Sequence, residues 1–88
     1  MKHIKNLKTG NMSITVNYMG IIAGKAKIYS ESIENTGSKS SILKSIMKTY
    51  PELAGLSFSV SINGVIVHGD MEIKDGDQIT LIPPAPGG

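Results

Sequence analysis

The residues best suited to chemistry stand at the C-terminus, where the chain reads Pro83-Pro84-Ala85-Pro86-Gly87-Gly88. Proline holds φ at about −65° and has no backbone N–H, so it cannot continue a sheet ladder. The segment is therefore predicted to leave the fold as an extended, stiff arm. Because the last two residues have no side chains, such an arm could enter a narrow channel and present its terminal carboxylate to another protein's active site. The alternative interpretation is an ordinary chain end of small residues.

Other residue types offer little chemistry. The absence of cysteine excludes disulfides, iron–sulfur clusters, thiolate zinc sites and cysteine nucleophiles. His3 and His68 have no second ligand at metal spacing, so we expect surface histidines and no metal site. Asp75 and Asp77 flank a glycine and are expected to form a turn. Since no nucleophile–base pair or phosphate loop is present, the chain is predicted to be no enzyme and to bind no cofactor of its own.

Composition narrows the class of protein further. The 88 residues fit one domain, and 40% hydrophobic with 18% charged residues is typical of a folded, soluble chain. All nine basic residues are lysines, and without arginine or tryptophan we expect no nucleic-acid binding. Apolar runs are far shorter than the ~20 residues that a membrane span needs. The chain is thus predicted to be cytoplasmic, with residues 1–11 as a basic extension of no assigned role.

Two hydrophobic patterns predict the elements of the fold. Residues 13–18 alternate between apolar and polar side chains, as a half-buried strand does, and residues 25–31 alternate again after a turn through Gly20 and Gly24. Apolar residues then recur at helical spacing from Ile42 to Tyr50, which predicts an amphipathic helix ended by Pro51. Either Ser38 or Ser40 could cap its start.

The second half of the chain is predicted to contain three strands. Residues 58–62 alternate, Asn63-Gly64 favours a tight type I′ turn, and residues 65–67 return as the partner strand. After the turn at residues 75–77, residues 78–82 form the last strand. One helix with about five strands predicts a two-layer α+β domain with a mixed sheet. We divide the chain into the extension (1–11), the domain (12–82) and the tail (83–88).

The segment from Asn63-Gly64 through the Asp-Gly-Asp turn, Leu81-Ile82-Pro83-Pro84 and the terminal Gly87-Gly88 resembles the ubiquitin-like sulfur carriers. Within that family it is most similar to the small subunit of molybdopterin synthase, and somewhat less to the sulfur carriers of thiazole synthesis. The resemblance covers the chain from Met12 to Gly88. It implies the β-grasp fold, whose order of elements matches the order predicted above.

The resemblance also implies a function. An adenylating enzyme of the ubiquitin-activating type would use ATP to activate the carboxylate of Gly88, which would become a thiocarboxylate. In molybdopterin synthase the tail enters the large subunit and gives its sulfur to a pterin precursor. Gly87, Pro83 and Pro84 would belong to the functional tail, and Ile82 and Leu81 to the partner-binding surface. This family often has aromatic residues where this chain has Leu81 and Ile82.

Three alternatives stay open. The same activated glycine could serve a ubiquitin-like protein modifier that is attached to lysines of target proteins. It could also supply sulfur to thiazole or amino-acid biosynthesis. The paired prolines favour the molybdopterin type, but they do not exclude those carriers. The third alternative is a β-grasp interaction domain whose tail has no chemical role.

Overall fold

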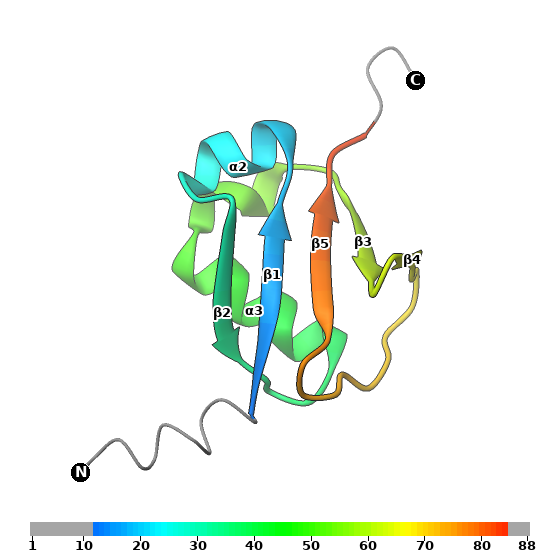
Figure 1. Ribbon diagram of the computed structural model, residues 1–88. Helices are drawn as coiled ribbons and strands as arrows, with labels where there is room; N and C mark the ends of the chain where they lie inside the picture. The colour runs from blue at the N-terminus through cyan, green and yellow to red at the C-terminus, as the bar shows by residue number, and fades with distance from the viewer. Residues whose placement is uncertain (1–11, 85–88) are drawn as a thin grey trace, which may run out of the picture.

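A mixed five-stranded sheet backed by helices forms the fold (Figure 1). The computed structural model describes residues 12–84, so the predicted extension (1–11) and residues 85–88 of the tail lie outside the described part. The elements are β1 (Ser13–Tyr18), α2 (Gly20–Ala26), β2 (Ser30–Glu34), α3 (Lys39–Thr49), the 3₁₀ helix η1 (Pro51–Gly55), β3 (Ser59–Ile62), β4 (Val65–Ile66) and β5 (Gln78–Ile82).

The strand order is β2-β1-β5-β3-β4, which places the last strand at the centre of the sheet. Strands β1 and β5 run parallel, and all other neighbours run antiparallel. The helices lie on one face of this sheet, with α3 crossing behind it (Figure 1). The predicted α+β architecture of β-grasp type is confirmed.

The core lies between the inner face of the sheet and the helices. Strands β1 and β5 and helix α3 each supply side chains that are at most 2% exposed, namely Ile14, Val16, Ile79, Leu81, Ile42 and Ile46. Burying a side chain of this size stabilises the fold by roughly 1.5–3 kcal/mol. The alternation predicted for β1 and β5 is therefore the pattern that builds the core.

Helix α3 begins where the sequence predicts it. Of the two capping candidates, Ser38 is the N-cap: its Oγ accepts a hydrogen bond from the backbone N–H of Ser41 at 3.2 Å, and the Ser41 Oγ accepts one from the Ser38 N–H. This capping box satisfies amides that would otherwise lack partners at the helix start. The helix ends at Thr49 with Tyr50 as its C-cap, and Pro51 opens η1 instead of continuing α3.

The two turns predicted in the second half of the chain are confirmed. Asn63 and Gly64 have φ values of 53° and 88°, as a two-residue hairpin turn requires, and Ile62 pairs with Val65 across it. In the second turn the Asp77 carboxylate accepts hydrogen bonds from the Asn63 Nδ2 at 2.9 Å and from the Lys74 backbone N–H at 2.8 Å. These hydrogen bonds hold the pKa of Asp77 below its usual range.

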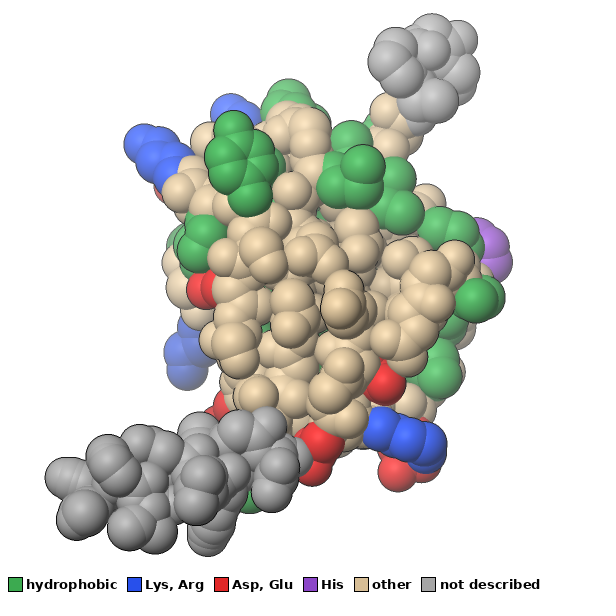
Figure 2. Space-filling view, viewed as in Figure 1, with side chains coloured by type: hydrophobic (Ala, Val, Ile, Leu, Met, Phe, Trp, Pro, Cys, Tyr) green, Lys and Arg blue, Asp and Glu red, His purple; other side chains and the backbone are tan. Residues whose placement is uncertain are grey.

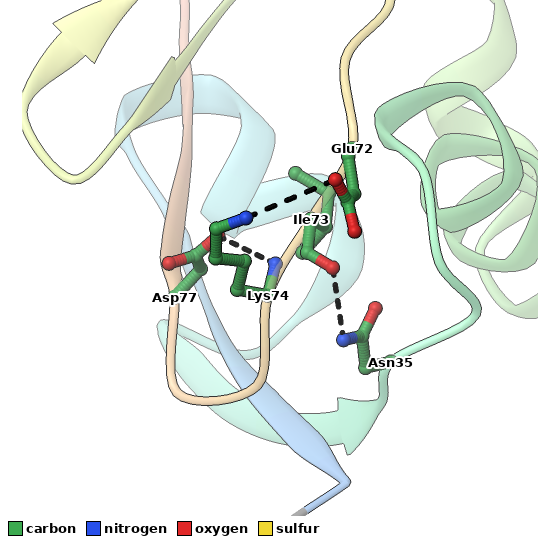
Figure 3. Close-up of polar contacts among 5 residues, drawn as sticks. All are labelled: Asn35, Glu72, Ile73, Lys74 and Asp77. Atoms are coloured by element: carbon green, nitrogen blue, oxygen red, sulfur yellow. Dashed lines mark hydrogen bonds and ion pairs between the residues drawn. The ribbon is translucent and has the colours of Figure 1, made fainter.

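Polar contacts hold the long connection between β4 and β5 against the domain. The Lys39 side chain is buried, and its Nζ donates hydrogen bonds to the carbonyl oxygens of Val67 and Gly69 at 2.7 and 2.9 Å. Figure 3 shows the Asn35 amide donating to the Ile73 carbonyl, a contact of 3.1 Å. A segment without regular structure is thereby fixed at three points before the turn that leads into β5.

The predicted turn at Gly20–Gly24 and the strand at residues 25–31 are wrong. Residues 20–26 form helix α2, and strand β2 begins only at Ser30. The helix is favoured because Ile22, Ala23 and Ala26 lie on one face and are buried in the core. Lys27 ends α2 in the left-handed conformation, with φ 62°, and its N–H donates to the Ala23 carbonyl.

Candidate functional site

The carboxyl end of β5 delivers the tail. This strand is paired on both sides, with β1 through Leu81 and Tyr18 and with β3 through Ile82 and Ser59. The chain leaves the sheet immediately afterwards, through the half-buried Pro83 and the exposed Pro84. A strand held by two neighbours is a rigid support, so the point from which the tail starts is fixed by the sheet.

Leu81 and Ile82 lie on opposite faces of the sheet, as alternation along a strand requires. The side chain of Leu81 is 0% exposed and belongs to the core. Ile82 is half-buried on the outer face. A protein approaching the tail would therefore meet the side chain of Ile82 and not that of Leu81.

Exposed apolar side chains gather at the end of the sheet from which the tail leaves. Because β1 and β5 are parallel and β2 is antiparallel to β1, the segments that follow β1 and β5 and precede β2 share this end. They supply Met19, Ile21 and Tyr29, which are 47%, 57% and 81% exposed. We call these three residues, together with Ile82 and Pro83, the tail-end patch. Figure 2 shows hydrophobic side chains over this end of the sheet. Monomeric proteins keep such apolar clusters small unless they bind something.

The centre of the outer face of the sheet, next to this patch, is polar but uncharged. It carries the side chains of Thr15, Asn17, Ser32, Gln78 and Thr80, and Figure 2 shows no charged group over its centre. The Asn17 amide donates to Gln78 at 3.4 Å and accepts from Ser30 at 3.0 Å. The tail-end patch therefore has a clear polar border on the sheet.

A buried tyrosine fixes the strand end beside the site. The Oη of Tyr18, at the end of β1, donates to a Glu31 carboxylate oxygen at 2.7 Å, and the Tyr50 Oη donates to the same oxygen at 2.9 Å. The two rings meet edge to face, 5.7 Å apart. Burial, and then the hydrogen bond to Glu31, raises the pKa of Tyr18 well above its ordinary value.

This raised pKa predicts a loss of stability at high pH. A phenol that stays protonated in the folded state contributes stability that is complete below the unfolded pKa of about 10 and lost as the pH rises beyond it. We expect Tyr18→Phe to lower the free energy of unfolding at pH 7 by about 1–2 kcal/mol, since a hydrogen bond to a carboxylate is lost. Above pH 10 its stability should fall less steeply than that of the natural chain.

Urea unfolding followed by circular dichroism from pH 7 to 11 measures both effects. Tyr29→Phe is the matched control, because the Tyr29 side chain is largely exposed. If the free energy of unfolding depends on pH in the same way in the natural chain and in the Tyr18→Phe chain, the raised pKa of Tyr18 is not the cause of the loss of stability at high pH.

The structure thus brings Ile82, Pro83 and Pro84 together at one end of the sheet, whereas Gly87 and Gly88 lie outside the described residues. Of the two histidines, His68 is exposed and His3 lies outside the described part. Within residues 12–84, no three side chains of His, Asp or Glu are grouped so that they could hold a metal ion. None of the helices in that range has the length and apolarity needed to cross a membrane.

Sequence reasoning missed the contribution of α2 to this end of the fold. Met19 and Ile21 stand at the start of that helix, and their exposure beside the tail depends on the parallel pairing of β1 with β5. The available signal was the spacing of Ile22, Ala23 and Ala26, which predicts a short helix and leaves Ile21 on its outer side.

A mixed sheet, a main helix and a proline-led tail at the end of the central strand define a β-grasp protein of the ubiquitin-like class. The model of the ThiS family matches residues 16–88. The chain therefore belongs to the ThiS family, and the predicted resemblance to ubiquitin-like sulfur carriers is confirmed. A search of curated proteins gave no match.

Solved structures with the same fold include molybdopterin converting factor subunits and small archaeal modifier proteins. A putative molybdopterin converting factor, subunit 1, from Pyrococcus furiosus has 22% identity and a TM-score of 0.77, over 84% of this chain and 99% of that one. The small archaeal modifier protein 1 of Haloferax volcanii has 15% identity and a TM-score of 0.73, over 83% and 98%. Subunits 1 and 2 of the Helicobacter pylori molybdopterin-converting factor form a complex, of which one chain has 25% identity and a TM-score of 0.64, over 88% and 100%.

Proposed function

We propose that this protein carries sulfur on its C-terminal glycine for molybdopterin synthesis. The observation that carries the proposal is the position of the tail: two prolines leave the central strand beside an exposed apolar patch, and the sequence ends in Gly87-Gly88. Membership of the ThiS family and the fold shared with molybdopterin converting factor subunits support it.

The chemistry required of the tail is the activation of a carboxylate. A carboxylate oxygen of Gly88 attacks the α-phosphorus of ATP in a partner enzyme and releases pyrophosphate, which leaves an acyl adenylate. A hydrosulfide-equivalent donor then displaces AMP, so that a C–S bond replaces the acyl C–O bond to the phosphate. The catalytic groups belong to the adenylating enzyme and to a larger synthase subunit. The chain itself supplies the acyl group and the surface by which both partners recognise it.

A second candidate function is protein modification, because the small archaeal modifier protein 1 shares the fold. A lysine amine of a target protein would then displace AMP and form an amide bond with Gly88. Both functions use the same adenylate, and they differ in the nucleophile that receives the acyl group.

Mass spectrometry of the C-terminus, on protein taken from its own cells, tests the proposal. A thiocarboxylate on Gly88 supports sulfur carriage, and transfer of that sulfur to a pterin precursor in the presence of the large subunit supports the molybdopterin assignment. A Gly-Gly remnant on lysines of other proteins would favour modification. A free carboxylate alone, with the activating enzyme and ATP supplied, would contradict both.

The tail-end patch predicts the effect of one surface substitution. Ile82→Asp places a charge where a partner must exclude water, so the affinity for the activating enzyme should fall at least about tenfold. Ser32→Asp is the control, since it puts the same charge on the outer face at β2, two strands away from β5. Calorimetry measures both affinities, and thermal melts show whether each variant is folded. An unchanged affinity for folded Ile82→Asp would remove this residue from the interface.

A further inference from the structure

The start of α2 touches the start of the tail. Gly20 has φ +55°, and a Cβ placed on it would lie 3.0 Å from Cγ and 3.9 Å from Cδ of Pro83. Carbon atoms in favourable contact are about 3.5–4.0 Å apart, so this Cβ would press on the proline ring. The absence of a side chain at Gly20 is therefore what allows Pro83 to lie where it does.

The residues on both sides of Gly20 are fixed by contacts with the rest of the domain. The Met19 N–H donates to the Leu81 carbonyl at 3.3 Å, which ties the chain before α2 to the end of β5. On the other side of Gly20, Ile22 and Ala23 are 0% and 4% exposed in the core. Gly20 therefore cannot move away easily, and an added Cβ would displace Pro83.

We propose that Gly20 is a positioning residue that sets the direction in which the tail leaves β5. The inference rests on the proposed function, because direction matters only if the carboxylate of Gly88 must reach a partner's active site. A proline-rich extended segment advances about 3.1 Å per residue, so the five residues after Pro83 reach up to about 15 Å. A rotation of about 10° at Pro83 would move the end of such a segment by roughly 3 Å.

A displacement of this size is large for catalysis. Misplacing a reacting group by about 1 Å can lower a rate by about 100-fold. The other side chains of the tail-end patch stay available in a Gly20 variant, since the only atoms within 4 Å of the added methyl group outside its neighbouring residues belong to Pro83. We therefore expect such a variant to bind the activating enzyme normally and to present its carboxylate poorly.

Gly20→Ala tests the proposal through the separation of kcat from KM in adenylation, measured as pyrophosphate release. We expect kcat to fall at least about tenfold, with KM changed less than about threefold. Gly24→Ala is the matched control: it adds the same methyl group to the same helix, where nothing apart from the neighbouring residues and the helix's own backbone lies within 4 Å of the new Cβ. An unchanged kcat for folded Gly20→Ala would overturn the proposal.

Two further variants separate the contact from backbone strain. Alanine is strained at φ +55°, whereas asparagine adopts this conformation at lower cost and brings the same Cβ, so Gly20→Asn should also lower kcat. Pro83→Ala removes Cγ and Cδ, and in that background Gly20→Ala should cause little further loss. Equal losses with and without the Pro83 ring would mean that strain alone is responsible.

A structural measurement distinguishes failure of the inference from failure of the proposed function. Residual dipolar couplings of Ile82, Pro83 and Pro84 should change in Gly20→Ala or Gly20→Asn and stay as in the natural chain in Gly24→Ala. Unchanged couplings in the Gly20 variants would refute the contact as a determinant of tail direction. If the couplings change but no activating enzyme adenylates the natural chain, the contact between Gly20 and Pro83 still sets the direction of the tail. In that case the proposed carrier function is refuted, and with it the role of Gly20 in that function.

Discussion

Removing Gly87 and Gly88 is expected to lower the rate of C-terminal adenylation at least about 100-fold while the domain stays folded. The shortened chain still ends in a carboxylate, but that group stands two residues nearer to the sheet, a shortfall of up to about 7 Å. A reacting group that far from the ATP α-phosphorus cannot attack it. All contacts among residues 12–84 are retained, so the melting temperature should not change.

Pyrophosphate release with the activating enzyme measures this rate, and a chain lacking Lys2 and His3 is the control of equal length. That control tests whether loss of any two terminal residues has the same effect. Full activity of the chain that ends at Pro86 would show that the diglycine is not the acceptor of AMP. The proposals of a carrier function and of a modifier function would then both be refuted.

Elements whose determinants lie close together in the sequence could be predicted. Helix α3 follows from apolar spacing, a serine cap and Pro51, and each of these acts within a turn or two of the helix. The hairpin at Asn63-Gly64 likewise depends on two residues that accept positive φ. These parts of the fold depend little on distant neighbours, which is why local patterns suffice.

Helix α2 could not be predicted in this way because its stability comes from distant parts of the chain. Seven residues are too few to form a helix by propensity alone. Its buried face packs against β1, which directly precedes it, and against β5 and η1, which are far away in the sequence. Ala26 and Ile28 also fit the alternation of apolar and polar residues in a strand, so the local pattern favours a strand. Tertiary packing overrides this preference.

The candidate site likewise has one part that depends on local sequence and one part that depends on distant segments. The composition of the tail is local, so Pro83, Pro84 and the terminal glycines could be identified from the sequence. Its surroundings depend on the pairing of β1 with β5, which brings Met19 and Gly20 beside Pro83 across more than sixty residues of sequence. No short-range pattern encodes that pairing, and Gly20 and Gly24 by themselves favour a turn.

Leu81→Ala is expected to lower the free energy of unfolding by about 2–5 kcal/mol, a large part of the 5–15 kcal/mol typical of a small domain. Leu81 is fully buried in the central strand, where its neighbours on β1 and β3 cannot close the resulting cavity. Ile82→Ala removes the same number of carbon atoms from the next residue. Because Ile82 lies half-buried on the outer face, its loss should cost under about 1.5 kcal/mol.

Urea unfolding compares the two variants, and calorimetry with the activating enzyme should rank them in the opposite order. Folded Leu81→Ala keeps the tail-end patch and should bind normally, whereas Ile82→Ala loses a side chain of that patch and should bind more weakly. This reversal is specific, because Leu81 faces the core, whereas Ile82 faces outward, where the proposed partner would bind. If both substitutions destabilise the domain equally, Ile82 is a core residue, and the partner contact must lie with Met19 and Ile21 across the start of the tail.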